Sequence, residues 1–167
     1  MINIQYYKLS VGELILGSFD DKLCLADWRY RKMRTNIDKR LQQGLKAEYI
    51  EQDTLVLQQT RIQLDEYFQN KRQIFDIQLL MVGTTFQNQV WQGLQAIPYG
   101  ETCSYLQLSK NIGHEKAVRA VASANGANAI SIMIPCHRVV GSDGSLTGYA
   151  GGLPAKKRLL QLEHSMI

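Results

Sequence analysis

Alternation of apolar and polar residues predicts strands near the start of the chain. Residues 2–6 alternate, and the apolar runs 12–19 and 22–28 flank Asp20-Asp21, a pair typical of a tight turn. These segments predict an antiparallel hairpin within a small sheet. Residues 29–53 are charged and weakly patterned, and we interpret them as loop with some helix.

Helical spacing replaces this alternation further along the chain. The positions that recur at three- and four-residue steps are Thr54, Leu57, Thr60, Leu64 and Phe68. They predict an amphipathic helix with Thr54 as its cap. Residues 73–77 predict another short strand, followed by a linker. We therefore expect an N-terminal sheet-plus-helix domain over residues 1–78.

A second helical pattern begins at residues 84–86 and opens a C-terminal domain over residues 84–167. Its apolar face consists of Phe86, Val90, Leu94 and Ile97, and Pro98-Tyr99-Gly100 ends it. The expected fold class is α/β of the α+β type. A small N-terminal antiparallel sheet domain with a helix precedes a mainly helical C-terminal domain.

Two short helices are predicted next. Residues 104–110 form the first, residues 111–114 a glycine-containing turn, and residues 115–125 a second helix that carries Lys116 and Arg119. This is helix-turn-helix spacing, in which the second helix enters a DNA groove, although a helical hairpin packed in a core fits it too. Small residues are frequent along the second helix and at its end: Ala117, Ala120, Ala122, Ser123, Ala124, Gly126 and Ala127. They allow close approach to a duplex without sequence readout.

Composition and charge agree with a DNA-binding protein without requiring one. The 167 residues are 45% hydrophobic, enough for a real core, and the net charge is +4. Residues 84–167 hold 7 Lys and Arg against 4 Asp and Glu, whereas residues 1–83 hold 12 against 11. The C-terminal part is thus the more positive, which suits a polyanion and also an ordinary solvated surface.

Segment hydrophobicity and cysteine usage predict a cytoplasmic protein. No segment approaches the ~18 uninterrupted apolar residues of a membrane helix, and the start of the chain lacks a signal peptide's apolar stretch. Cys24, Cys103 and Cys136 are odd in number and lack paired spacing, so we expect no disulfide framework. We also expect no metal site and no membrane partner.

The sequence Ile134-Pro135-Cys136-His137-Arg138-Val139-Val140 sets a cysteine beside an imidazole. A thiol with an ordinary pKa of about 8.5 is mostly protonated at neutral pH, so a nearby base favours the nucleophilic thiolate. Residues 131–134 predict a short buried strand, which Pro135 ends because it has no N–H to donate. This pattern indicates a cysteine nucleophile at a strand end. The adjacency of Cys136 and His137, taken alone, is also compatible with a small buried thiol that has no catalytic role.

Together with Thr147-Gly148-Tyr149-Ala150-Gly151-Gly152-Leu153, this sequence resembles the O6-alkylguanine-DNA alkyltransferases over about residues 86–163. The resemblance implies DNA repair by direct, irreversible transfer of an alkyl group, methyl foremost, from O6 of guanine to Cys136. O4-alkylthymine is implied as a second substrate. No cofactor is implied, and each molecule would act once.

The resemblance also implies a set of catalytic residues. Cys136 is the nucleophile, and His137 is its base, acting through a water because sequence neighbours rarely aim their side chains at each other. Glu163, at the end of the last helix (residues 155–164), orients His137; without the motif it fits a solvated helix-end charge. Asn128 connects the recognition helix to the active-site loop.

DNA and substrate contacts follow from the same resemblance. Because the target atom lies inside the duplex, the nucleotide must be turned out into a pocket. The DNA-binding residues are Tyr105, Lys116 and Arg119, with Arg119 filling the vacated stack. The residues implied at the base pocket are Tyr105, Val139, Tyr149, Ala150 and Lys156. The alternatives are a phosphate contact or a surface ion pair for Arg119, a core aromatic for Tyr105 and a surface position for Lys156.

The expected partner is double-stranded DNA bearing O6-alkylguanine, bound by a monomer. Two other classes of function use the same features. One is a non-catalytic protein that binds alkylated lesions and recruits other repair factors. The other is a cysteine hydrolase, which would leave the helix-turn-helix unexplained.

Overall fold

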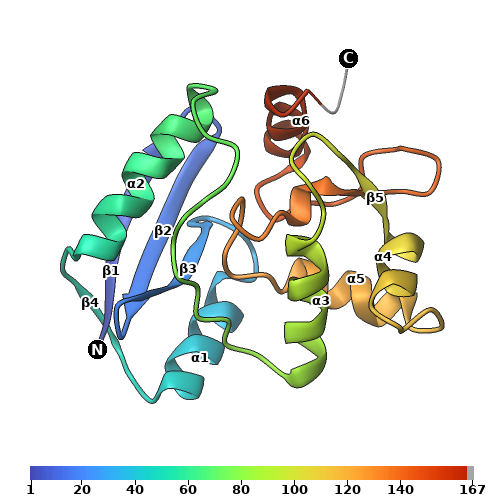
Figure 1. Ribbon diagram of the computed structural model, residues 1–167. Coiled ribbons are helices and arrows are strands. Elements are labelled where there is room, and N and C mark those ends of the chain that lie inside the picture. Colours follow the sequence, from blue (N-terminus) through green and yellow to red (C-terminus); the bar gives the residue numbers. More distant parts are fainter. Residues whose placement is uncertain (165–167) are drawn as a thin grey trace. The chain divides into compact units, whose positions relative to one another are not determined.

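The structure is a computed structural model that describes residues 1–164. It contains two compact units, Met1–Gly83 and Thr84–Ile167, whose elements are labelled in Figure 1. Each unit has its own core. No helix among residues 1–164 is both long and apolar enough to span a bilayer.

The first unit is built on a four-stranded sheet with strand order β3-β2-β1-β4. Strands β1 (Ile2–Leu9), β2 (Gly12–Phe19) and β3 (Lys22–Trp28) are antiparallel, which confirms the predicted hairpin. Asp20 and Asp21, at φ 51° and 59°, form the turn in left-handed backbone that aspartate tolerates. The α+β fold class is confirmed.

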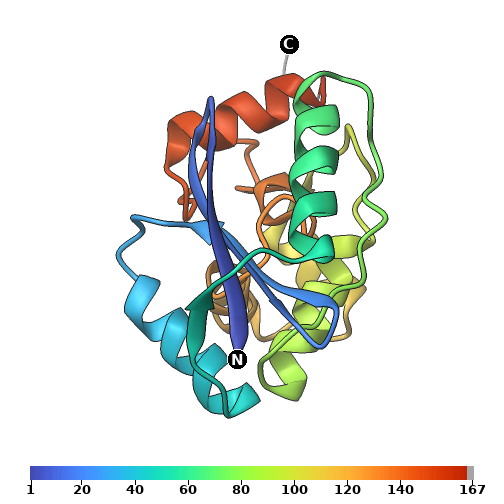
Figure 2. The same cartoon turned by 90° about the vertical axis from the view of Figure 1, so that its left-hand side faces the viewer.

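Helix α2 (Leu55–Phe68) covers this sheet, as both views of the cartoon show (Figures 1 and 2). Thr54 caps it as predicted, accepting a hydrogen bond from the Leu57 N–H at 3.3 Å. Tyr67, rather than Phe68, completes the buried stripe with Leu57, Thr60 and Leu64.

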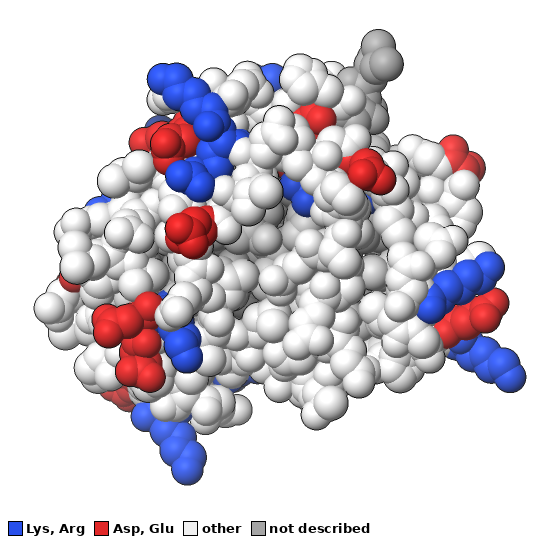
Figure 3. All heavy atoms as spheres, in the orientation of Figure 1, with Lys and Arg blue, Asp and Glu red and all other residues white. Residues whose placement is uncertain are grey.

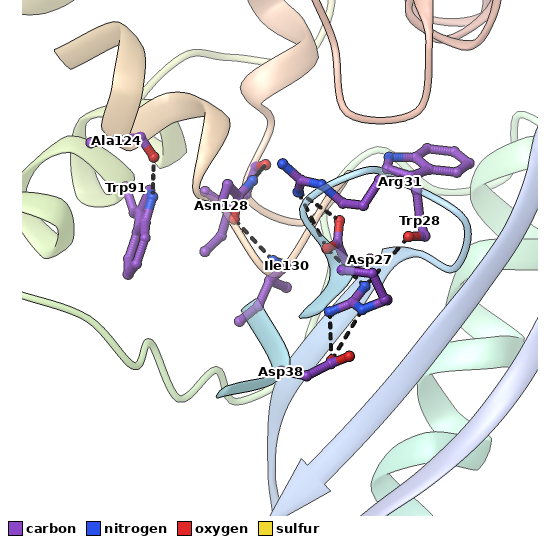
Figure 4. Close-up of polar contacts among 10 residues, drawn as sticks. Asp27, Trp28, Arg31, Asp38, Trp91, Ala124, Asn128 and Ile130 are labelled. Carbon is purple, nitrogen blue, oxygen red and sulfur yellow. Dashed lines mark hydrogen bonds and ion pairs between the residues drawn. The ribbon is translucent and has the colours of Figure 1, made fainter. Parts of the chain in front are cut away.

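Residues 29–53 are more regular than predicted. They contain helix α1 (Arg34–Leu45) and strand β4 (Tyr49–Glu51), which joins β1 in parallel. A buried ion-pair cluster ties α1 to the end of β3 (Figure 4): Asp27 accepts from Arg31 at 3.2 Å and from Arg34 at 2.9 Å. Arg31 and Arg34, two of the charged residues that suggested a loop, therefore form ion pairs that stabilise the fold.

The predicted strand at residues 73–77 is wrong. The side-chain amide of Gln63 accepts from the Asp76 N–H at 2.8 Å and donates to the Asp76 carbonyl at 3.3 Å. These bonds replace the ladder partners that a strand would need. Pairing occurs just beyond, in an isolated parallel bridge between Leu79 and Leu23.

The second unit begins with three packed helices: α3 (Thr85–Gln95), α4 (Tyr105–Asn111) and α5 (Val118–Gly126). Helix α3 contacts both others, and the Trp91 indole N–H donates to the Ala124 carbonyl at 2.9 Å (Figure 4). The helix-turn-helix prediction is right in kind, but α5 starts three residues later than predicted.

The rest of this unit carries the cysteine motif. The one-turn 3-10 helix η1 (Cys136–Arg138) leads into β6 (Val139–Val140), which pairs in parallel with β5 (Cys103–Ser104); α6 (Leu153–Leu162) follows. The predicted strand at residues 131–134 is wrong, because these buried residues form a turn with Ile132 at φ 72°. An apolar run reports burial and cannot distinguish a strand from a buried turn.

Candidate active site

Cys136 opens helix η1 and is almost fully buried, with 4% of its surface exposed. Its N–H donates to the Ile134 carbonyl at 2.8 Å, and Pro135 precedes it. The chain thus presents the thiol from a tight turn that β6 follows at once. The next two residues, His137 and Arg138, are also buried.

His137 and Arg138 converge on one carboxylate at the C-cap of α6. His137 Nε2 lies 2.8 Å from Glu163 Oε2, while Arg138 donates from Nε to Oε1 at 2.8 Å and from Nη2 to Oε2 at 3.0 Å. Arg138 Nη1 also donates to the Ile97 carbonyl at 2.6 Å. A carboxylate only 1% exposed is thus held by a planar two-donor fork and an imidazole.

Burial and hydrogen bonding oppose each other at Glu163. Burial alone would raise the pKa of Glu163, but hydrogen bonds from His137 and Arg138 outweigh it and lower the pKa from 4.5 to about 2. For His137, burial lowers the pKa despite the hydrogen bond to Glu163. At neutral pH the pair is therefore a carboxylate and a neutral imidazole.

This protonation state fixes the imidazole tautomer. An ionised Glu163 only accepts, so His137 Nε2 carries the proton and Nδ1 carries a lone pair. Nδ1 is buried and has no hydrogen-bond partner among residues 1–164. The imidazole can therefore accept a proton at Nδ1 while Glu163 stabilises the charge that results.

Asn128 lies just beyond α5 and joins that helix to the segment that leads to Cys136, residues 130–134. Its Nδ2 donates to the Ile134 carbonyl at 2.9 Å, and its Oδ1 accepts from the Ile130 N–H at 2.9 Å (Figure 4). The amide thus supplies partners that the irregular segment lacks, which matches the bridging position predicted for it.

Lys156 is fully buried, not on the surface, and joins two segments of the predicted pocket. Its Nζ donates to the Val139 carbonyl at 2.6 Å and to the Thr147 carbonyl at 3.3 Å. Burial lowers the pKa of Lys156, and negative charge on Cys136 opposes that shift only in part.

The remaining predicted pocket residues lie on the loop between β6 and α6 and on α4. Tyr149 and Ala150 are half-buried, and Gly152, at φ 90°, turns the chain into α6. Tyr105, the first residue of α4, places its phenol oxygen 3.1 Å from Thr147 Oγ1.

Two of the three predicted DNA contacts, Lys116 and Arg119, are exposed, whereas Tyr105 is half-buried. Arg119 lies on the first turn of α5, whereas Lys116 precedes the helix, contrary to its predicted place on it. Ala120, Ser123 and Gly126 share the exposed face of α5. Basic and acidic side chains lie close together on the surface shown in Figure 3, so no patch of a single sign dominates that face.

Two residues with clear contacts were not assigned roles from the sequence. Arg138 belongs to the motif at residues 134–140, but its pairing with Glu163 depends on tertiary structure. Thr147 belongs to the motif at residues 147–153, and only the fold brings it to Tyr105. Within residues 1–164, no group of three or more His, Cys, Asp or Glu side chains is arranged to hold a metal ion.

Comparison with known proteins matches both units. The family model described as "6-O-methylguanine DNA methyltransferase, ribonuclease-like domain" matches residues 2–81, and that described as "6-O-methylguanine DNA methyltransferase, DNA binding domain" matches residues 85–165.

Individual relatives agree over almost the whole length. A methylated-DNA–protein-cysteine methyltransferase of Methanosarcina acetivorans is 49% identical over 159 residues, covering 95% of this chain and 96% of the relative. One of Methanosarcina barkeri is 43% identical over 163 residues, covering 96% and 98%. The crystal structure of Mycobacterium tuberculosis OGT in complex with DNA superposes with a TM-score of 0.84 at 37% identity, covering 98% of this chain and 93% of that one.

Proposed function

This chain belongs to the 6-O-methylguanine DNA methyltransferase family, and on that premise we propose that it repairs DNA by moving the methyl group of O6-methylguanine onto Cys136. The transfer is direct and irreversible, because a thioether has no easy leaving route. The observation that carries the assignment is the buried His137–Glu163 pair adjoining Cys136. Other O6-alkyl groups and O4-alkylthymine belong to the same proposal.

The reaction begins with a proton transfer. His137 Nδ1 takes the thiol proton of Cys136 through a bridging water, and Glu163 stabilises the imidazolium through Nε2–H. Arg138 keeps the carboxylate ionised and in place throughout. The structure supports this order of events because Nδ1 is the ring nitrogen left with a lone pair.

The methyl transfer is a single in-line displacement. The thiolate sulfur attacks the methyl carbon and forms an S–C bond, while the bond between the methyl carbon and O6 breaks and leaves its electron pair on guanine. The guanine takes up one proton and the His137 imidazolium gives one up, so the products are unmodified guanine, S-methylcysteine and a neutral imidazole. Electrostatic support for the thiolate comes from the nearby buried Lys156.

Recognition of the base is assigned to the loop between β6 and α6 and to its neighbours. The carbonyls of Cys136 and Val139 accept from the guanine exocyclic amine, and Tyr149 and Ala150 line the pocket. Lys156 already donates to the Val139 carbonyl at 2.6 Å, which leaves the second lone pair of that oxygen for the base.

Double-stranded DNA is the proposed partner, bound by a monomer in the cytoplasm. The exposed small residues of α5 allow close approach of backbone to duplex, Lys116 contacts the phosphates, and Arg119 fills the space of the everted nucleotide. Arg119→Ala should therefore slow repair of duplex DNA more than reaction with free O6-methylguanine base. Equal losses on both substrates would exclude the stacking role.

The test of the reaction is the intact mass after incubation with a duplex oligonucleotide containing O6-methylguanine. We expect a gain of one methylene unit, located on the peptide that contains Cys136 and absent in Cys136→Ala. Cys24→Ala and Cys103→Ala are matched controls that keep the gain. An unchanged mass with tight lesion binding would overturn transfer in favour of a non-catalytic lesion-binding protein.

A further inference from the structure

A single hydrogen bond links α4 to the middle of the loop that follows β6. The phenol oxygen of Tyr105 and Oγ1 of Thr147 are 3.1 Å apart, and either oxygen can donate. Both side chains are partly buried, so water competes with this bond only in part. The two residues are 42 positions apart, and the fold alone brings them together.

The Tyr105 backbone is firmly held. Ser104 caps α4 by accepting from the Gln107 N–H at 3.0 Å, and Ser104 also pairs with Val140 in the β5–β6 ladder. Ser109 Oγ donates to the Tyr105 carbonyl at 2.8 Å. The start of α4 is therefore fixed to the strand that directly follows the Cys136 turn.

The Thr147 backbone is held by Lys156 of α6. Its carbonyl accepts from Lys156 Nζ, which also donates to the Val139 carbonyl. With both backbones anchored, the bond between the two hydroxyls restrains the position of the Tyr105 phenol.

We propose that Thr147 is a positioning residue that donates its hydroxyl proton to Tyr105, so that the phenol is held ready to donate its own proton to a ring nitrogen of the everted base. A hydroxyl that accepts one hydrogen bond becomes a better donor in the next, so the two bonds strengthen each other. This inference rests on the proposed function, because only base repair would bring an everted purine to Tyr105. It assigns substrate positioning to a residue of the loop that does not itself touch the reacting atoms.

The test measures single-turnover methyl transfer from duplex O6-methylguanine DNA by four proteins: wild type, Thr147→Val, Tyr105→Phe and the double variant. Thr147→Val keeps the shape of the side chain and removes the hydroxyl. It should lower the second-order rate constant about three- to tenfold, the size of one neutral hydrogen bond. In the Tyr105→Phe background, the same change should have less than about a twofold effect, because its partner is gone.

Thr147→Ser separates the hydroxyl from packing and should restore most of the rate. Thr85→Val, at an exposed helix position, is the matched control for the same chemical change and should react like wild type. A Thr147→Val loss of equal size in both backgrounds would overturn the inference, because Thr147 would then act through packing alone. An unchanged rate in Thr147→Val would also overturn it, provided that wild type transfers the group.

Failure of the proposed function looks different. If wild-type protein gains no methyl group, both the transfer reaction and the role of Thr147 fall together. If wild type transfers the methyl group but the four proteins show no coupling between Thr147 and Tyr105, the reaction stands and the positioning role is excluded.

Discussion

Replacing Glu163 by glutamine removes the charge on which His137 and Arg138 converge, while preserving the shape of the side chain. The folded protein lowers the Glu163 pKa from 4.5 to about 2. That difference corresponds to about 3 kcal/mol of folding free energy, and loss of one partner from a buried ion pair costs a similar 3–5 kcal/mol. We therefore expect Glu163→Gln to lower the free energy of unfolding at pH 7 by about 3 kcal/mol.

The size of this loss should depend on pH with a definite sign. Because the folded-state pKa lies below the unfolded value, the carboxylate stabilises the fold fully above about pH 4.5 and progressively less as pH falls toward 2. Wild type thus loses this contribution in acid, and the variant has none to lose. The difference between the two proteins should shrink from about 3 kcal/mol at pH 7 to about 1 kcal/mol at pH 3.

Urea unfolding of both proteins at pH 7, 4.5 and 3 measures this difference directly. Glu115→Gln is the matched control, because its carboxylate is exposed and lies 3.9 Å from Lys110. It should change stability by less than about 1 kcal/mol at any of these pH values. A Glu163→Gln loss of the same size at pH 7 and pH 3 would refute the assignment of the low pKa to this carboxyl group.

Three other measurements test neighbouring parts of the second unit. Because burial lowers the pKa of His137, the acid limb of the single-turnover pH–rate profile should lie below pH 6.5; a limb centred above that value would contradict a neutral imidazole. Asn128→Ala should lower the free energy of unfolding by about 2–4 kcal/mol, because the Ile130 N–H and the Ile134 carbonyl both lose a partner, and an unchanged urea midpoint would count against this. Gly93→Ala should cost about 1–2 kcal/mol in the same assay, because the new Cβ would lie 2.5 Å from Ile112 Cγ2 and overpacking exceeds the gain in helix propensity. Gly126→Ala should be neutral or stabilising, because its added Cβ would meet no atom within 4 Å beyond its chain neighbours and its own helix backbone.

The sequence predicted correctly those turns and helix ends that are determined by residues within a few positions of them. The Asp20-Asp21 turn and the Thr54 cap lie where the pattern placed them, because turn and cap preferences act within a few residues. The family assignment also came from a short motif, and the family models confirm it.

Segments governed by tertiary partners were not predictable in the same way. The strand expected at residues 73–77 is absent because the distant Gln63 side chain binds its backbone, and α1 is stabilised by Asp27 from another element. Residues 131–134 are buried as expected but form a turn, supported by the Asn128 amide. The errors at residues 73–77 and 131–134 concern backbone groups that bond to a side chain rather than to a neighbouring strand.

The turn at Cys136 has a chemical consequence that a strand would not have. In a strand, Cys136 and Arg138 would point to one face and His137 to the other. In a 3-10 helix, with three residues per turn, successive side chains leave the axis about a third of a turn apart. Three neighbouring residues therefore point in three directions.

That divergence explains how adjacent residues serve different parts of one site. His137 and Arg138 both contact the carboxylate of Glu163, while Cys136 opens the same one-turn helix. Because Nε2 of His137 contacts Glu163, the nitrogen available to the proposed proton transfer is Nδ1. The division of roles among Cys136, His137 and Arg138 thus follows from the one-turn helix after Pro135.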